Sequence, residues 1–215
     1  MKKNIFVLLQ ICLITFAINA QEILNIGGKD KVVVASIAKN EELNFEKIGT
    51  KKGFELHLFA LKDNSKKLIT KIAYYSGYNK LCNNGMFYFS IDNHFINKEY
   101  PNLTSELFVY NTKKGTINKV LNSLLFTVSN DGRYICYCEV YQVTKKENHV
   151  VPYWYIYDTK TKKNKPIISN KQKNNWDVGI PVFDESINSF ILDLHCDGDI
   201  MDKLIFNPYT MDFKN

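Results

Sequence analysis

The chain has 215 residues, of which 28 are Lys or Arg and 22 are Asp or Glu, giving a formal charge of +6. This mild charge argues against a nucleic-acid-binding protein. The densest basic stretch, Lys160–Lys173, lacks interleaved aromatic residues for base stacking and is predicted to be a solvated loop. The content of 13 Tyr and 14 Phe favours β-strands.

The N-terminus has the pattern of an export signal. A basic head, Met1–Asn4, precedes an apolar run, Ile5–Ile18, and a small residue, Ala20. We therefore expect residues 1–20 to be a bacterial signal peptide and residues 21–215 to be one repeat domain, periplasmic or secreted. An uncleaved anchor or a buried N-terminal helix are the alternatives. No second apolar run is long enough to cross a bilayer, so no stable membrane span is expected after cleavage.

Short runs of strand-forming residues follow the signal. The clearest are Lys31–Ile37, Met86–Ile91, Arg133–Tyr141 and Ser189–Leu194. Tight turns at Asn83–Gly85 and Asn130–Gly132 precede two of them, because Asn, Asp and Gly tolerate a left-handed backbone. The segment Glu41–Ile48 is expected to form a turn of helix.

One segment recurs at intervals of about 48 residues, which is typical of stacked repeat units. Leu107–Lys113 is repeated as Trp154–Lys160, and weaker echoes occur at Leu56–Lys62 and Lys203–Pro208. The best unit contains four predicted antiparallel strands: Leu124–Val128, Arg133–Val143, Trp154–Thr159 and a short edge strand near Pro166. Four such strands in roughly 45 residues make up a propeller blade.

The segment Val128–Tyr137 resembles the core of the WD-like repeats of TolB-type proteins, and Tyr155–Thr159 is similar to the strand that follows it there. The resemblance is good over residues 124–168 and fair over 81–121. It implies a bacterial β-propeller, often periplasmic. We therefore expect an all-β fold, a propeller-like array of about four antiparallel four-stranded blades. A closed small ring, a partial propeller, an open array and a part of a larger assembly remain open.

Four cysteines lie beyond the expected signal: Cys82, Cys136, Cys138 and Cys196. An exported chain permits disulfides, and four thiols allow three pairings. Cys136 and Cys138 share one face of a predicted strand, where a bond between them has poor geometry. Buried free thiols are favoured, with one cross-blade bridge as the alternative.

Two sets of residues are candidates for a site. The partner-binding candidates are Tyr153, Trp154, Trp176 and His149, which lie in or beside predicted loops. The loops Asn93–Thr104 and Thr144–Tyr153 interrupt equivalent strand pairs and are expected on one rim. The metal candidates are Asp193, His195, Asp197 and Asp199, since calcium prefers clustered carboxylates. For the second set an ordinary structural turn is favoured over a metal site, and core packing is favoured for Tyr155 and Tyr157.

These patterns favour an exported, non-catalytic binding or scaffolding module of the bacterial cell envelope that holds a protein or peptide. No cofactor is required, calcium being the one candidate. No His-Glu-x-x-His or Gly-x-Ser-x-Gly motif is present. The alternative is a small secreted hydrolase assisted by a metal at the Asp/His cluster. The partner and the oligomeric state stay open.

Overall fold

The computed structural model describes residues 31–50, 53–63, 65–72, 75–91, 106–123, 125–139, 153–167, 177–196 and 199–214. The chain divides into two compact units, Met1–Gly77 and Tyr78–Asn215. The described residues contain strands and turns and no helix, so they include no helix able to cross a membrane. The expected signal at residues 1–20 lies outside them.

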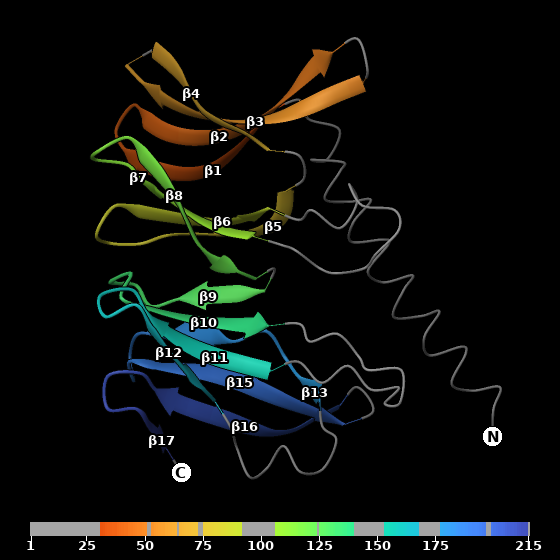
Figure 1. Cartoon of the computed structure of the whole chain (residues 1–215), viewed down its shortest axis with the longest axis vertical. Coiled ribbons are helices and arrows are strands. Elements are labelled where there is room, and N and C mark those ends of the chain that lie inside the picture. Colours follow the sequence, from red (N-terminus) through yellow and green to blue (C-terminus); the bar gives the residue numbers. More distant parts are fainter. Residues whose placement is uncertain are drawn as a thin grey trace, which may run out of the picture. The chain divides into compact units, whose positions relative to one another are not determined.

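The first unit contains sheet A, an antiparallel sheet whose strands follow one another in chain order (Figure 1). Its strands are β1 (Lys31–Ala38), β2 (Glu41–Thr50), β3 (Gly53–Lys62) and β4 (Ser65–Ile72). Asn40, at a φ of 64°, makes the turn between β1 and β2. Leu43, Phe45 and Leu58 are buried on neighbouring strands of this sheet.

The helical turn expected at Glu41–Ile48 is wrong, because this segment is strand β2. Leu43 and Phe45 are two residues apart, and they are paired with Ala60 and Leu58 on β3. The strand also pairs with β1 on its other side. Hydrogen-bonded partners on both sides outweigh the local preference of a Glu- and Lys-containing segment.

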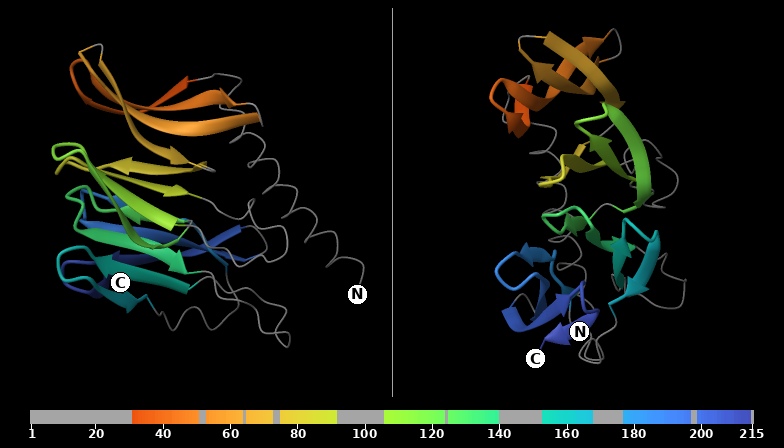
Figure 2. Two further views of the ribbon diagram at one scale, coloured as in Figure 1. Left: turned by 45° about the horizontal axis from the view of Figure 1, so that its top comes forward. Right: turned by 90° about the vertical axis from the view of Figure 1, so that its left-hand side faces the viewer.

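The second unit contains three sheets, each again a run of consecutive antiparallel strands (Figure 2). Sheet B consists of β5 (Tyr75–Leu81), β6 (Met86–Ile91), β7 (Glu106–Asn111) and β8 (Thr116–Asn122). Sheet C consists of β9 (Phe126–Val128), β10 (Tyr134–Glu139), β11 (Tyr153–Asp158) and β12 (Lys163–Pro166). Sheet D consists of β13 (Asp177–Val178), β14 (Val182–Asp184), β15 (Ser189–Cys196), β16 (Asp199–Asn207) and β17 (Asp212–Lys214).

The recurring segment occupies the same place in every sheet. Its four copies form β3, β7, β11 and β16, each of which pairs with the strand before it and with an edge strand after it. In sheet D the first strand is split into β13 and β14, which both pair with β15. The prediction of repeated four-stranded units is therefore confirmed. Closure of the sheets into a ring stays a prediction.

Two apolar layers join the sheets of the second unit. The layer between sheets B and C contains Tyr88, Leu107, Phe126, Ile135 and Tyr137, with Tyr155 and Tyr157 packed against it. The layer between sheets C and D contains Tyr134, Trp154, Ile156, Phe190, Leu192 and Phe206. Successive residues of β10 point alternately into the two layers, as a strand covered on both faces requires. The core placement predicted for Tyr155 and Tyr157 is confirmed.

Candidate functional site

The third strands of sheets B, C and D all end in a side-chain-capped turn. Asn111, Asp158 and Asn207 each accept hydrogen bonds through Oδ1 from the backbone N–H groups two and three residues later. A short side chain with an oxygen at this distance stabilises such a turn without help from neighbours. The recurring Asn or Asp in the sequence therefore has a structural role in each sheet.

The turn between β9 and β10 is held by its own aspartate. Asp131 Oδ1 accepts hydrogen bonds from Ser129 Oγ at 2.6 Å and from the Arg133 N–H at 3.0 Å. Gly132 has a φ of +73°, which an L side chain rarely adopts. A Cβ atom there would come within 2.4 Å of Asn84 Nδ2. Glycine is thus required at position 132 because the backbone is left-handed there and because Asn84 leaves no room for a Cβ atom.

Both neighbouring sheets bind this turn. From sheet B, Asn84 Nδ2 donates to the Asp131 carbonyl at 2.8 Å, and the Tyr88 hydroxyl donates to the Gly132 carbonyl at 3.2 Å. From sheet D, the Tyr209 hydroxyl donates to Asp131 Oδ2 at 2.9 Å. We call Asn84, Asp131, Gly132 and Tyr209 the turn clasp, because they tie three successive sheets together.

The clasp and its surroundings shift several pKa values. Burial alone would raise the pKa of Asp131, but hydrogen bonds from Ser129, the Arg133 N–H and Tyr209 lower it below its usual value. The pKa of Asp158 is also lowered, because backbone N–H bonds and Arg133 outweigh the effect of burial. Burial and the hydrogen bond to Asp131 raise the pKa of Tyr209 to about 12. The two carboxylates are therefore held ionised as acceptors.

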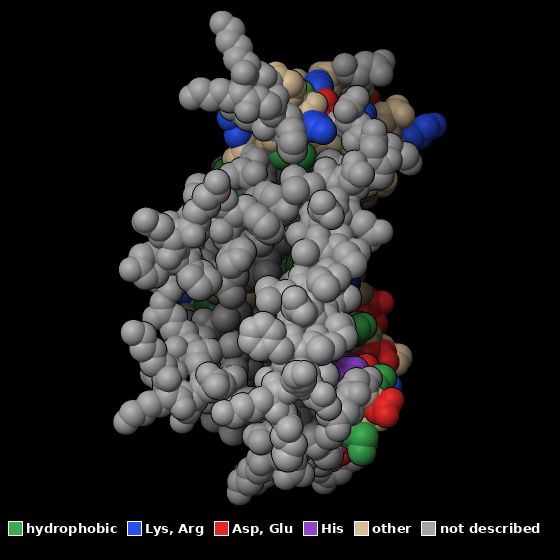
Figure 3. Space-filling view, turned by 90° about the vertical axis from the view of Figure 1, so that its right-hand side faces the viewer, with side chains coloured by type: hydrophobic (Ala, Val, Ile, Leu, Met, Phe, Trp, Pro, Cys, Tyr) green, Lys and Arg blue, Asp and Glu red, His purple; other side chains and the backbone are tan. Residues whose placement is uncertain are grey.

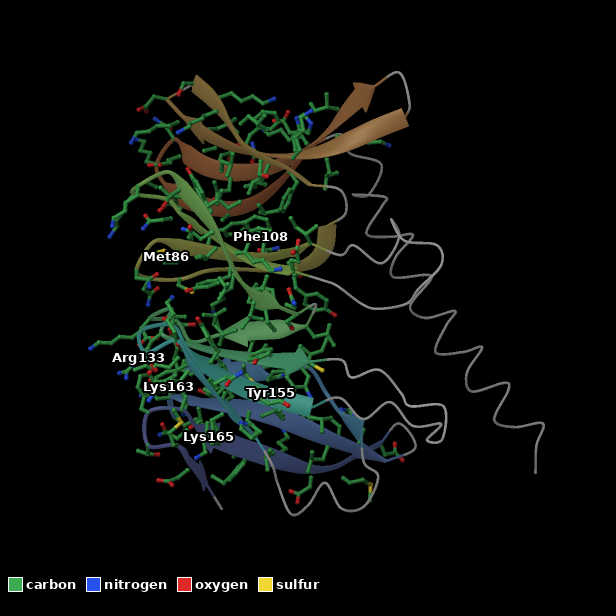
Figure 4. All side chains as sticks on the ribbon, in the orientation of Figure 1. Met86, Phe108, Arg133, Tyr155, Lys163 and Lys165 are labelled. Carbon is green, nitrogen blue, oxygen red and sulfur yellow. The ribbon has the colours of Figure 1, made fainter. Side chains whose placement is uncertain are left out.

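Basic side chains lie at the turn end and on the edge strand of sheet C. Figure 4 shows Arg133 at the turn end of sheet C and Lys163 and Lys165 on its last strand. Lys160, Lys162, Lys163 and Lys165 are exposed, as expected for a solvated segment, although the last two belong to edge strand β12 rather than a loop. Lysines on an edge strand discourage pairing with another chain.

Of the four residues predicted to bind a partner, only Trp154 has a described side chain. Tyr153 and Trp154 are consecutive in β11, and consecutive positions of a strand belong to opposite faces of the sheet. Trp154 is 2% exposed in the layer between sheets C and D, and a side chain so deeply buried does not meet a partner directly. Trp176 and His149 lie outside the described residues. Trp154 therefore has a packing role that its place beside a loop concealed.

The predicted metal cluster is partly described. Asp193 and His195 lie on the half-buried face of β15, alternating with buried Leu192 and Leu194. Lys203 Nζ lies 3.7 Å from Asp193 Oδ1, and this ammonium competes with a cation. Asp199 is exposed at the start of β16, while Asp197 lies outside the described residues. Within the described residues, no three His, Cys, Asp or Glu side chains gather as metal ligands do.

The three described cysteines are buried free thiols. Cys136 and Cys138 both contribute to the layer between sheets C and D, on one face of β10 as expected. Burial raises the pKa of Cys82 to about 12 and that of Cys136 well above its usual value. The thiols of Cys82 and Cys136 therefore stay protonated at neutral pH and are poor nucleophiles. The side chain of Cys196 lies outside the described residues.

One contributor to the clasp carries little signal in the sequence. Tyr209 follows Asn207-Pro208, where the equivalent residues of the other sheets are Lys113 and Lys160. Its ring packs edge-on against the ring of Tyr134, with 4.9 Å between the two ring centroids. Its hydroxyl donates a hydrogen bond to Asp131 on another sheet. When the repeats are aligned, Tyr stands at this turn position in place of Lys. That difference is the one sequence signal that points to a special role of Tyr209.

No protein-family model matches the chain, and no curated protein matches it. An oligogalacturonate lyase in complex with manganese is similar in structure, with a TM-score of 0.52 and 12% identity over 81% of this chain and 49% of the lyase. TolB from Acinetobacter baumannii gives a TM-score of 0.48 and 13% identity over 81% of this chain and 40% of TolB. The β-propeller domain of the Trilobed protease from Pyrococcus furiosus gives a TM-score of 0.38 and 10% identity over 86% of this chain and 71% of that domain.

The chain spans about half the length of the lyase and less of TolB, and identities this low concern the fold alone. Four successive four-stranded units, each with the recurring segment as its third strand, are what the TolB-type resemblance predicts. The TolB-type β-propeller prediction is confirmed at the level of the fold.

Proposed function

We propose that the chain is an exported, non-catalytic binding or scaffolding module of the bacterial cell envelope. It holds a protein or peptide partner through two long connections, residues 92–105 and 140–152. The charged and apolar pattern of residues 1–20 supports export. Sheets B, C and D would then be part of a partial propeller that presents these connections on one rim.

The observation that carries this proposal is the difference in length between equivalent connections. In sheets B and C, segments 92–105 and 140–152 join the second strand to the third. In sheets A and D, the same strands are joined by residues 51–52 and 197–198 alone. Connections longer than about 12 residues are uncommon in compact domains and are frequently binding loops.

The two long connections also leave from corresponding ends of packed sheets. They begin after Ile91 of β6 and Glu139 of β10, which are the second strands of sheets B and C. Residues from these two sheets form one apolar layer. The predicted partner-binding residue His149 lies in the second connection, and Tyr153 directly follows it.

Site-specific photo-crosslinking in cells tests the proposal. A photoreactive residue at His149 or Asn102 should give an adduct with the same partner, identified by mass spectrometry. Lys114, in the turn at the opposite end of sheet B, is the matched control and should give none. Equal adducts at Lys114, or none at the two connection positions, would contradict it.

The metal-assisted hydrolase is the second candidate, because Asp193 and His195 share one face of β15. Metal analysis and calcium-dependent thermal shifts of the purified full chain test it. Binding that is lost in Asp197→Asn but kept in Asp184→Asn would favour the hydrolase over the binding module.

A further inference from the structure

Exposed lysines are concentrated at the hairpin turns that follow the third strands of sheets B and C. These turns join β7 to β8 and β11 to β12. We call the five lysines at them the tip lysines: Lys113, Lys114, Lys160, Lys162 and Lys163. Within the described residues none of them forms an ion pair with a carboxylate, whereas five lysines elsewhere do: Lys31, Lys62, Lys66, Lys119 and Lys203. The tip lysines therefore carry uncompensated positive charge.

Hydrogen bonds hold the two turns at one end of the packed sheets. In sheet B the Thr112 N–H donates to the Gly85 carbonyl at 3.0 Å, and in sheet C the Thr159 N–H donates to the Arg133 carbonyl at 2.8 Å. The turn clasp joins these two places, because Asn84 beside Gly85 donates to the turn of sheet C that precedes Arg133. Packed sheets lie about 10 Å apart, so the tip lysines of both sheets belong to one charged surface.

The acidic side chains at this end do not neutralise that surface. Asp131 accepts hydrogen bonds from Ser129, the Arg133 N–H and Tyr209. Asp158 accepts hydrogen bonds from two backbone N–H groups of its own turn and lies beside the Arg133 guanidinium. The tip lysines and Arg133 outnumber these two carboxylates, so this end keeps a net positive charge.

The opposite end of the sheets has a different character. The two long connections leave from it, because β6 and β10 run away from the clasped turns. In the space-filling view from that side, the described side chains visible in the lower part include acidic side chains and a histidine (Figure 3). The unpaired lysines are thus a feature of the turn end.

The hairpin turn itself does not require lysine. The equivalent turn of sheet D, Asn207–Met211, has the same side-chain cap and contains no lysine. The turn that precedes β15 contains Asp184 and Glu185. Because the same turn forms with neutral residues and beside acidic ones, the lysines of sheets B and C indicate a ligand that carries negative charge.

The residue types at this end select the class of ligand. A lysine ammonium is a point charge on a flexible stem and lacks the planar fork with which arginine recognises a single phosphate or carboxylate. No aromatic residue lies within Asn111–Gly115 or Asp158–Lys163, so bases have no stacking platform there. Charges spread over two turns suit an extended anionic surface. We propose that the tip lysines bind the anionic headgroups of a lipid bilayer.

The number of lysines sets the expected strength. Each lysine close to an anionic bilayer strengthens binding about fivefold. The chain should therefore bind vesicles that contain phosphatidylglycerol more than about 100-fold more tightly than vesicles of phosphatidylcholine alone. The difference should disappear at about 1 M salt, where the Debye length falls to about 3 Å. This inference concerns the end opposite the proposed partner loops and does not depend on the proposed function.

Vesicle co-sedimentation of the purified full chain tests the inference. The measured quantity is the ratio of the partition constants for the two vesicle types, because the apolar run Ile5–Ile18 would bind both. Changing Lys113→Gln and Lys114→Gln together should lower the ratio about 25-fold, and Lys160→Gln with Lys162→Gln should lower it by a similar factor. Far-UV circular dichroism shows whether each variant is folded.

The matched control is Lys119→Gln with Lys203→Gln. It removes the same formal charge from the second unit, but these two ammonium groups are paired with Glu106 and Asp193. The control should keep the ratio within about twofold of the wild type. Equal binding to both vesicle types, or an unchanged ratio in the tip variants, overturns the inference. An equal loss in the control also overturns it, because net charge and not the tip lysines would then be responsible.

Discussion

Sheets C and D share one strand order but differ in what covers them. Sheet C is buried on both faces, with Ile135 and Tyr137 facing sheet B and Cys136 and Trp154 facing sheet D. Sheet D buries the face toward sheet C and exposes Val182 on the other. The strands of the repeat are therefore continuous apolar runs in a middle sheet. In the last sheet, buried apolar residues alternate with more exposed ones.

The turns that begin the two long strands differ in the same way. In sheet C the turn has Gly132 in the left-handed region, with Asn84 of sheet B against it. In sheet D the left-handed residue is Asn188, at a φ of 49°, and Asp184 accepts two hydrogen bonds from Ser186 within the turn. A glycine is needed where a neighbouring sheet approaches, whereas an asparagine is sufficient where the turn is held by its own residues.

The largest expected difference is in the cores. Trp154→Ala removes a side chain buried between sheets C and D, and it should lower the free energy of unfolding by about 3–5 kcal/mol. Ile200→Ala, on the exposed part of sheet D, should change it by less than about 0.5 kcal/mol. Urea unfolding followed by far-UV circular dichroism measures both. Similar losses would show that the two sheets are equally buried in solution.

The second difference is in the turns. Gly132→Ala should destabilise the chain by about 1–2 kcal/mol, because the left-handed backbone disfavours a Cβ atom. The new Cβ would also displace Asn84 from the Asp131 carbonyl. Gly49→Ala is the control, since a Cβ there meets no atom within 4 Å. A neutral Gly132→Ala would mean that the turn is not clasped as described.

The sequence predicted the sheets well, because their signals are local and repeated. The continuous apolar run of β10 and the Asn-Asp-Gly turn before it locate one strand pair, and the recurring segment locates the next strand. The segment Glu41–Ile48 failed because its strand form depends on β1 and β3, which lie outside any local window.

The candidate site was predicted less well, because its contacts join distant residues. Trp154 lies next to a loop in sequence, yet its burial depends on Phe190 and Leu192 of the following sheet. The contact from Tyr209 to Asp131 spans 78 residues, so no local pattern reveals it.

The clasp itself gives a smaller effect. Tyr209→Phe keeps the ring against Tyr134 but removes the donor to Asp131, and it should cost about 1 kcal/mol at neutral pH. Asp131→Asn should be non-additive with it in a double-mutant cycle, since both changes affect one hydrogen bond. Additive losses would show that the hydroxyl and the carboxylate act independently.

The same pair predicts a dependence on pH. Because the folded state lowers the pKa of Asp131, its contribution to stability is present above the usual carboxyl pKa of about 3.9. It is lost as the pH falls through the lowered value, when the folded carboxylate binds a proton. The stability difference between the wild type and Asp131→Asn should therefore shrink in acid. A difference that is constant from neutral pH to acid would exclude a charged acceptor.

The smallest effect is expected in the turn of sheet D. Asn188→Gly gives this left-handed position the residue that sheet C uses, but no clasp from a neighbouring sheet is at stake among the described residues. Glycine relieves the backbone strain of the folded state but increases the conformational entropy of the unfolded chain. These opposing effects should keep the change in the free energy of unfolding within about 0.5 kcal/mol. Thermal and urea unfolding of Asn188→Gly, beside Gly132→Ala, compare the two turns directly. A loss as large as that of Gly132→Ala would mean that Asn188 makes contacts beyond its own turn, and that the last sheet has a neighbour on its outer side as sheet C does.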